Sequence, residues 1–381
     1  MQSGAACPGR AIPVDSALVE VLIPMKPFPR STRRDLLRLP LAGAALPLLS
    51  APLKDEYDPA NIKIATRLYL RSAKDDDLLF LKQLGMRWVH AEFGAEAPYE
   101  RIKATQERLG RYGLKIYTGV MDAYRSLKIQ LGQPGRDEDI ARFQTFLQDL
   151  GKLGVPVAKI DFHPGNTYTT KQIQTPRGYT AREFDVDDFR KNVEKQMYER
   201  VYTADDIWAN YKYFIDAVLP VAEQANVKLA LHPDDPPLAM MNGVAKVFVH
   251  YDGIRKAEEI AKGSKHFGLT FCVGTWSEGG DKMGKDVFGM IKDFGGRGKI
   301  FTVHFRNVSG PLPRFHETFH DDGYMDMYAV MKALRQVKFN GSMVPDHIPV
   351  MNGDDAFRRA GHAYTITYMR ALLKRANEEV G

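Results

Sequence analysis

From about residue 61 onward, short apolar runs alternate with stretches in which apolar residues recur every three to four positions. The short runs are typical of β-strands covered on both faces, and the longer repeats are typical of amphipathic helices. Strands are expected at residues 61–70, 87–93, 114–121, 156–163, 227–232, 267–273, 300–306 and 341–346. The clearest helices are expected at residues 137–153, 205–225, 252–262, 283–294, 326–337 and 355–376, and Thr203 is placed to cap the second of these.

Eight strand-and-helix repeats over about 325 residues predict an α/β fold, a (β/α)8 TIM barrel that forms a single domain over residues 53–381. A doubly wound open sheet is the alternative. No Gly-x-Gly-x-x-Gly pattern follows any expected strand, so the sequence gives that alternative no dinucleotide site. Residues 164–202 are the longest irregular stretch, and in a barrel they would form a lid-like loop over the carboxyl ends of the strands.

Residues 1–52 form a leader that differs from the rest of the chain. Thr32-Arg33-Arg34 precedes an apolar stretch at 39–49, which is too short to span a bilayer of about 30 Å. This pattern predicts a twin-arginine export signal, recognised by the twin-arginine translocation machinery, and a periplasmic or exported protein. Residues 1–24 are interpreted as a start-site artefact, because Met25-Lys26 opens a more ordinary signal. The alternative is a basic start to a buried helix, with the protein remaining cytoplasmic.

Composition narrows the class of protein further. The 381 residues are 44% hydrophobic and 26% charged, which is ordinary for a globular chain and excludes disorder. The leader carries half of the net charge of +6, and no long basic run follows it, so no nucleic-acid partner is expected. Cys7 and Cys272 are the two cysteines, and loss of the leader would leave Cys272 alone, which excludes a disulfide scaffold.

Four successive strands of the expected barrel end on side chains that bind metals, namely His232, Cys272, His304 and Asp346. Each alone is ordinary: a packed histidine, a small buried cysteine or a turn-capping aspartate. The carboxyl ends of barrel strands share one rim, so two imidazoles, a thiolate and a carboxylate there predict a divalent-metal site. Sulfur and imidazole favour zinc or iron, whereas the carboxylate also suits manganese.

Other polar residues stand beside these strand ends. Arg306 offers a planar fork of donors suited to a carboxylate, Asn307 adds a neutral donor, and an ordinary loop salt bridge is the alternative. His347 is placed to exchange a proton near neutral pH. Asp234 is a candidate for binding hydroxyls or orienting a metal ligand, with helix capping as the alternative, and His163 is a candidate substrate contact.

Several of these residues occur in motifs that resemble those of mannonate dehydratases, in the same order along the chain. The most specific motif is His-Pro-Asp-Asp-Pro-Pro at residues 232–237. The others are the Cys-x-Gly segment at 272–274, the run at 303–308, Glu-Thr-Phe at 317–319 and Pro-Asp-His at 345–347. The resemblance covers most of residues 60–375.

The resemblance implies a (β/α)8 barrel that binds Mn²⁺, or Fe²⁺, through the counterparts of His232, Cys272, His304 and Asp346. It further implies a hydro-lyase that converts the sugar acid D-mannonate to 2-dehydro-3-deoxy-D-gluconate and water. His347 would then transfer a proton, and Arg306 would bind a carboxylate or hydroxyl. Two other functions remain open: a metal-dependent sugar isomerase or epimerase on the same barrel, and a non-catalytic periplasmic sugar-acid binder. Assembly into a homo-oligomer is also left open.

Overall fold

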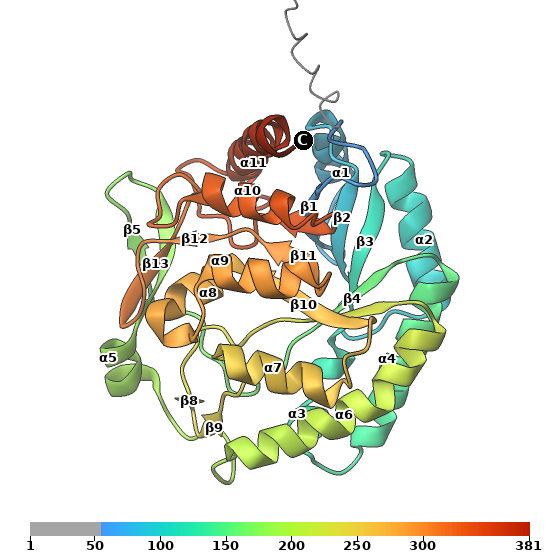
Figure 1. The fold of residues 1–381 in the computed structure, drawn as a ribbon, viewed down its shortest axis with the longest axis vertical. Coiled ribbons are helices and arrows are strands. Elements are labelled where there is room, and N and C mark those ends of the chain that lie inside the picture. The colour runs from blue at the N-terminus through green and yellow to red at the C-terminus, as the bar shows by residue number, and fades with distance from the viewer. Residues whose placement is uncertain (1–54) are drawn as a thin grey trace, which may run out of the picture. The chain divides into compact units, whose positions relative to one another are not determined.

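A computed structural model describes residues 55–381 of the chain, and the expected export signal, its cleavage region and Cys7 lie outside the described residues. Parallel strands close into a barrel in the order β1-β14-β11-β10-β7-β4-β3-β2 (Figure 1). These strands are β1 (Lys63–Tyr69), β2 (Trp88–Glu92), β3 (Lys115–Val120), β4 (Val157–Ile160), β7 (Lys228–Leu231), β10 (Phe267–Cys272), β11 (Ile300–His304) and β14 (Ser342–Val344). All eight lie within the expected segments. The closed barrel confirms the TIM-barrel prediction and is incompatible with an open sheet.

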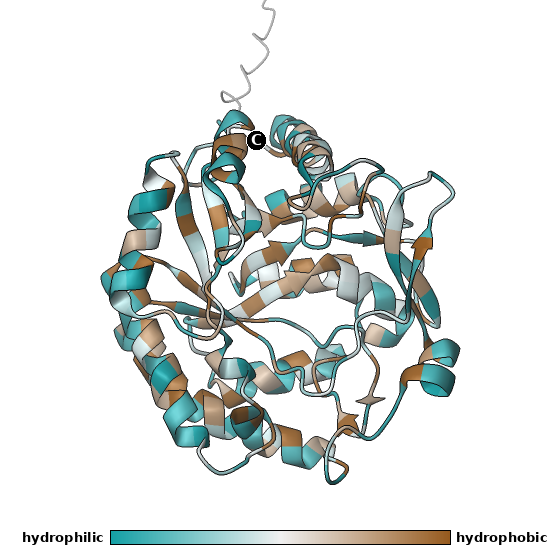
Figure 2. Cartoon of the chain, turned by 180° about the vertical axis from the view of Figure 1, so that it is seen from behind, coloured by the Kyte–Doolittle hydropathy of each residue, from teal (hydrophilic) through white to brown (hydrophobic). Residues whose placement is uncertain are grey.

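Helices cover the outside of the barrel (Figure 1). The α-helices of the described residues are α1 (Asp75–Gln83), α2 (Tyr99–Gly110), α3 (Leu127–Gln130), α4 (Arg136–Lys152), α5 (Val186–Asp188), α6 (Ala204–Gln224), α7 (Tyr251–Ile260), α8 (Val273–Gly279), α9 (Val287–Met290), α10 (Met327–Gln336) and α11 (Arg359–Val380). Figure 2 shows that these helices carry many hydrophilic residues, whereas the barrel strands are rich in hydrophobic ones. Within residues 55–381, no helix combines the length and apolar character needed to cross a membrane.

The start of α6 shows how the sequence defines an element boundary. The Thr203 hydroxyl accepts a hydrogen bond from the Asp206 backbone N–H, and the Asp206 carboxylate accepts one from the Thr203 backbone N–H. This capping box satisfies two donors that the first helical turn leaves without partners. The expected cap at Thr203 is confirmed.

The single helix expected at 283–294 is wrong. The chain there forms a 3₁₀ turn ending at Met283, then the short α9, and then a π-helical turn over Ile291–Gly295. Gly284 has φ +77°, a left-handed conformation that a continuous helix cannot contain, and the Asp286 carboxylate starts a new helix by accepting a hydrogen bond from Gly289 N–H. Apolar spacing alone does not reveal these breaks.

The stretch 164–202, expected to be irregular, contains a β-hairpin made of β5 (Lys171–Gln174) and β6 (Thr180–Asp185). The hairpin belongs to a second sheet of order β12-β13-β6-β5, together with β12 (Asn307–Val308) and β13 (Arg314–Thr318). The antiparallel pairing of β6 with β13 therefore brings two loops that are distant in sequence together beside the barrel. A separate two-stranded ribbon pairs β8 (Met240–Met241) with β9 (Val244–Ala245).

Candidate active site

The strands β7, β10, β11 and β14 are consecutive neighbours around the barrel and run parallel, so their carboxyl ends lie on one rim. The predicted metal ligands follow these ends. Ligand atoms of His232, Cys272 and His304 all lie within 4.8 Å of one another, and all three residues are buried. Asp346 Oδ1 lies 3.1 Å from His304 Nδ1, and its Oδ2 lies 4.0 Å from Cys272 Sγ. The structure thus brings together all four residues.

Hydrogen bonds fix the tautomer of His232. Its Nδ1 donates to the Pro233 carbonyl at 2.7 Å, so in the neutral ring the lone pair is on Nε2, which faces His304 Nδ1 at 3.2 Å. Burial, and next the neighbouring His304, hold the pKa of His232 well below its usual range. His163 Nε2 also donates to the Pro233 carbonyl, at 2.7 Å, so this oxygen accepts two hydrogen bonds from histidine rings. The His232 ring is therefore neutral and oriented, as a metal-ligating imidazole must be.

The donor set fits a divalent cation. The buried His304 Nε2 makes no hydrogen bond with any part of the chain that the structure describes. Burial raises the pKa of the Cys272 thiol to about 12, so a thiolate at this position requires a nearby positive charge. Asp346 has φ +64°, a left-handed conformation uncommon for an aspartate, and this conformation accompanies the approach of its carboxylate to the cluster.

Arg306 lies behind this cluster and is 2% exposed. Its guanidinium contacts Glu278 Oε1 at 2.6 Å, Asp235 Oδ2 at 2.7 Å and Asp346 Oδ2 at 3.2 Å. Glu317 Oε1 lies 3.5 Å from the same guanidinium, so four buried carboxylates surround it, and this arrangement favours a role in orienting Asp346 over contact with a substrate carboxylate. The packing of Arg306 also explains why the Cys-x-Gly segment has glycine at position 274, because a Cβ at Gly274 would lie 2.5 Å from Arg306 Nε.

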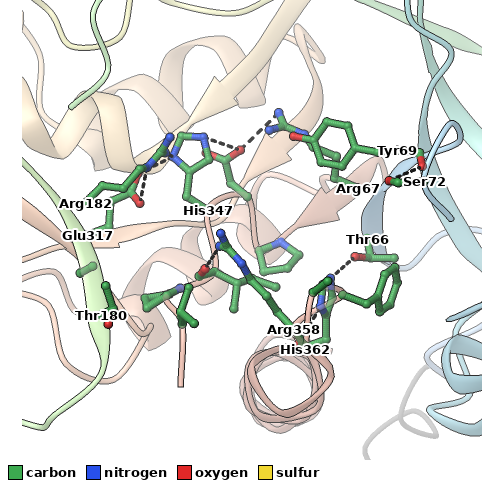
Figure 3. A pocket seen from close by; sticks show the side chains of 18 of the residues that line it. Thr66, Arg67, Tyr69, Ser72, Thr180, Arg182, Glu317, His347, Arg358 and His362 are labelled. Atoms are coloured by element: carbon green, nitrogen blue, oxygen red, sulfur yellow. Dashed lines mark hydrogen bonds and ion pairs between the residues drawn. The ribbon is translucent and has the colours of Figure 1, made fainter. Parts of the chain in front are cut away.

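His347 lines a cavity of about 330 Å³ at the rim (Figure 3). Its Nδ1 lies 2.5 Å from Glu317 Oε1 and also contacts the Arg182 guanidinium, so Nδ1 is engaged by the chain and Nε2 is the nitrogen that can exchange a proton with a ligand. Arg182 on β6 donates a hydrogen bond to the same carboxylate, with 2.9 Å between Arg182 Nε and Glu317 Oε2. Although burial opposes it, contacts with His347 and Arg182 hold the pKa of Glu317 well below its usual range. Sequence reasoning assigned no role to Glu317 and missed Arg182, because the β6–β13 pairing joins them.

Other charged residues, also missed, lie on β1 and β4, and Arg67 among them contacts the same Asp346 carboxylate as Arg306. Arg67 on β1 contacts Asp346 Oδ1 and Glu92 Oε1, each at 3.3 Å, and it lines the same cavity. On β4, Lys159 contacts Asp161 Oδ2 at 2.9 Å, and both side chains are buried. Polar residues at alternate positions 159, 161 and 163 of an otherwise apolar strand were the available signal, since alternate residues of a barrel strand face inward.

The remaining candidates serve the chain around the site. Asn307 Nδ2 donates to the carbonyls of His320 at 3.0 Å and Met325 at 3.1 Å, and so holds the loop after β11. Asp234 Oδ2 accepts the backbone N–H of Val247 at 3.1 Å and of Phe248 at 2.9 Å. Neither side chain lines the cavity of about 330 Å³. These contacts match the capping alternative for Asp234 better than binding of a substrate hydroxyl.

Fold and site together define a (β/α)8-barrel protein with a buried His-Cys-His-Asp cluster at its catalytic rim. Residues 186–380 match the family model described as D-mannonate dehydratase. Mannonate dehydratase of Streptococcus pneumoniae is 30% identical over 281 residues, which cover 67% of this chain and 75% of the relative. Mannonate dehydratase 2 of Halalkalibacterium halodurans is 27% identical, with 77% and 92% covered.

Solved structures agree with these sequence comparisons. The crystal structure of mannonate dehydratase from Streptococcus suis serotype 2 superposes with a TM-score of 0.75 at 28% identity, covering 84% of this chain and 96% of that one. A xylose isomerase domain protein from Planctomyces limnophilus, with a TM-score of 0.55 at 11% identity and coverage of 84% and 99%, shares the fold. The chain belongs to the mannonate dehydratase family, and it is a hydro-lyase of that type.

Proposed function

We propose that this protein dehydrates D-mannonate to 2-dehydro-3-deoxy-D-gluconate and water, with a divalent cation as cofactor. The observation that carries the proposal is the buried His232–Cys272–His304 cluster with Asp346 beside it, since Asp346 also lines the cavity that His347 lines. Family membership supports the substrate, since the relatives are mannonate dehydratases.

The cation would be held by His232, Cys272, His304 and Asp346. Two imidazoles and a thiolate suit Fe²⁺ and Zn²⁺, the carboxylate also suits Mn²⁺, and the family resemblance favours Mn²⁺ or Fe²⁺. When bound, the ion supplies Lewis acidity toward a substrate oxygen and so helps to stabilise the negative charge that develops as carbon 2 loses its proton.

The chain's own groups supply charge and proton transfer. Arg67 and Arg182 line the cavity and are placed to bind the substrate carboxylate, next to which the charge develops. His347 Nε2 moves the proton that must reach the departing hydroxyl of carbon 3, and Glu317 stabilises the protonated ring through Nδ1. The hairpin that carries Arg182 forms one wall of the cavity and limits the access of water.

The test is turnover of D-mannonate by purified protein with Mn²⁺ added, followed as the 2-keto-3-deoxy acid. His347→Asn should abolish turnover, whereas His316→Asn, at a histidine outside the cavity, should retain it. Epimerised sugar without loss of water would identify an isomerase or epimerase instead. Ligand binding that is undiminished in metal-free wild type, Cys272→Ser and His304→Ala proteins would identify a sugar-acid binder.

We also propose that the protein is exported through the twin-arginine route. The support is the Thr32-Arg33-Arg34 pattern before the apolar stretch at 39–49. Export in a folded state would carry Cys272 across with its ligand cluster already assembled. N-terminal sequencing of protein from periplasmic and cytoplasmic fractions tests the proposal. A cytoplasmic product that retains the leader would contradict it.

A further inference from the structure

The cavity at the rim has a second polar group, apart from the residues assigned above. It extends from Asp346 and His347 past the loop after β14 to Thr66, Arg358 and His362 (Figure 3). At about 330 Å³ it lies within the size range of small-molecule sites, which begins near about 300 Å³. The proposed reaction at carbons 2 and 3 uses Arg67, Arg182 and His347. Thr66, Arg358 and His362 therefore have no role so far.

His362 presents a hydrogen-bond acceptor to this part of the cavity. Its Nδ1 donates to the Arg358 carbonyl at 2.9 Å, so in the neutral ring Nε2 carries the lone pair, which accepts from the Thr66 hydroxyl at 3.1 Å. The ring stacks on Phe357, with centroids 5.0 Å apart and planes 10° from parallel. Burial lowers the pKa of His362, which keeps the ring neutral. Its orientation is therefore set before any ligand binds.

Arg358 presents donors to the same space. Its guanidinium donates to the Ile348 carbonyl, and no carboxylate within residues 55–381 forms an ion pair with it. The adjacent Arg359, in contrast, pairs with Asp77 and Asp355. Arg67 and Arg182, the other arginines of the cavity, also have carboxylate partners. Arg358 is exposed to solvent at this end of the cavity, and it is the arginine of the cavity lining that has no carboxylate partner among the described residues.

We propose that Thr66, Arg358 and His362 form a subsite for the terminal hydroxyl groups of the sugar acid, so that this end of the cavity selects for chain length. The inference rests on the proposed function and names what part of the substrate the second group recognises. Arg358 donates, and the oxygen of the Thr66 hydroxyl accepts while its proton is held by His362 Nε2; a ligand hydroxyl that displaces Thr66 can donate to Nε2 in its place. A hydroxyl both donates and accepts, and so satisfies all three. A ligand with a second carboxylate at this end could only accept hydrogen bonds there. Its lone pairs would then face the lone pair of His362 Nε2.

Binding at this end would affect the reaction at the other end. Contacts made by a remote part of a substrate can be used to orient its reacting carbons. A sugar acid that lacks the terminal hydroxyls would therefore be turned over less efficiently by the wild type, and would be insensitive to substitutions in the subsite.

The experiment compares kcat/KM for D-mannonate with that for the four-carbon acid that keeps its configuration at carbons 2 and 3. His362→Phe keeps the ring and removes the acceptor, and Arg358→Met removes the donors. Each should lower kcat/KM for D-mannonate by about tenfold or more, as loss of a hydrogen bond to a charged or buried partner does, and leave the four-carbon acid within about twofold. His362→Gln, which retains an acceptor, should recover part of the loss.

Arg359→Met is the matched control, since Arg359 pairs with the buried Asp77 and with Asp355 and does not line the cavity, and it should leave kcat/KM for both substrates unchanged. If the subsite variants reduce both substrates by the same factor, or neither, the inference is wrong while the proposed function stands. Faster turnover of the six-carbon dicarboxylate than of D-mannonate by the wild type would also refute it. A wild type that dehydrates no sugar acid refutes the proposed function, and the subsite with it.

Discussion

Replacing Arg306 by methionine tests whether this side chain is the electrostatic centre of the site. The substitution keeps an unbranched side chain but leaves Asp235, Glu278 and Asp346 without their guanidinium, and the side chains of these acids are 7%, 0% and 1% exposed. Removing one partner of a buried ion pair costs about 3–5 kcal/mol. With an unfolding entropy of about 2.1 cal/mol/K per residue over about 330 residues, the melting temperature should fall by about 4–7 °C.

The assay is circular dichroism, with urea unfolding for the free energy and a thermal melt for the melting temperature, both in EDTA so that no cation compensates for the lost charge. Burial raises the pKa of Glu278, and Arg306 opposes that rise, so Glu278 is the acid most penalised without the arginine. Glu278→Gln should therefore rescue part of the deficit of Arg306→Met. Arg314→Met, whose side chain is 59% exposed, should cost less than about 1 kcal/mol. A loss of unfolding free energy below about 1 kcal/mol for Arg306→Met would refute the reasoning. So would an equal loss from Arg306→Met with Glu278 present and with Glu278→Gln.

Three further predictions concern single positions. Gly274→Ala places a Cβ 2.5 Å from Arg306 Nε, and should destabilise the fold by about 1–3 kcal/mol and reduce bound metal, measured by urea unfolding and elemental analysis; unchanged values would contradict the close contact. Thr203→Ala removes the cap of α6 and should cost about 1 kcal/mol in the same unfolding assay, whereas Thr203→Ser should cost little; equal losses would contradict the capping role. Burial lowers the pKa of Lys246 to about 8 from 10.5, so the folded protein binds fewer protons than the unfolded chain between these values. Relative to Lys246→Met, the wild type should therefore gain up to about 2 kcal/mol of stability as the pH rises from 8 to 9.5, and a constant difference would contradict this pKa.

The barrel was predictable because each strand is a short apolar run and each boundary is a local feature. The predicted metal-ligand positions followed from one rule, that functional side chains stand where barrel strands end. His232, Cys272, His304 and Asp346 all obey it, and the structure places them together. No metal is needed to recognise this arrangement, since closure of the parallel sheet alone determines which strand ends are neighbours.

What sequence reasoning missed depends on contacts between distant segments. Arg182 reaches Glu317 because β6 pairs with β13, and nothing in either local sequence specifies that pairing. Arg306 follows a strand end and therefore resembles a substrate-binding residue, but its four carboxylate neighbours come from other loops, from α8 and from β13. The pocket formed by Thr66 and His362 joins the first strand to the last helix and has no sequence signature.

The central claim is that four strand ends hold one divalent cation beside His347. The most direct measurement is a crystal structure of the Mn²⁺-loaded protein with anomalous diffraction data at the manganese edge. The account predicts one strong anomalous peak per chain, within bonding distance of His232 Nε2, Cys272 Sγ, a ring nitrogen of His304 and a carboxylate oxygen of Asp346. A peak elsewhere, or Cys272 Sγ turned away from the ion, would contradict it.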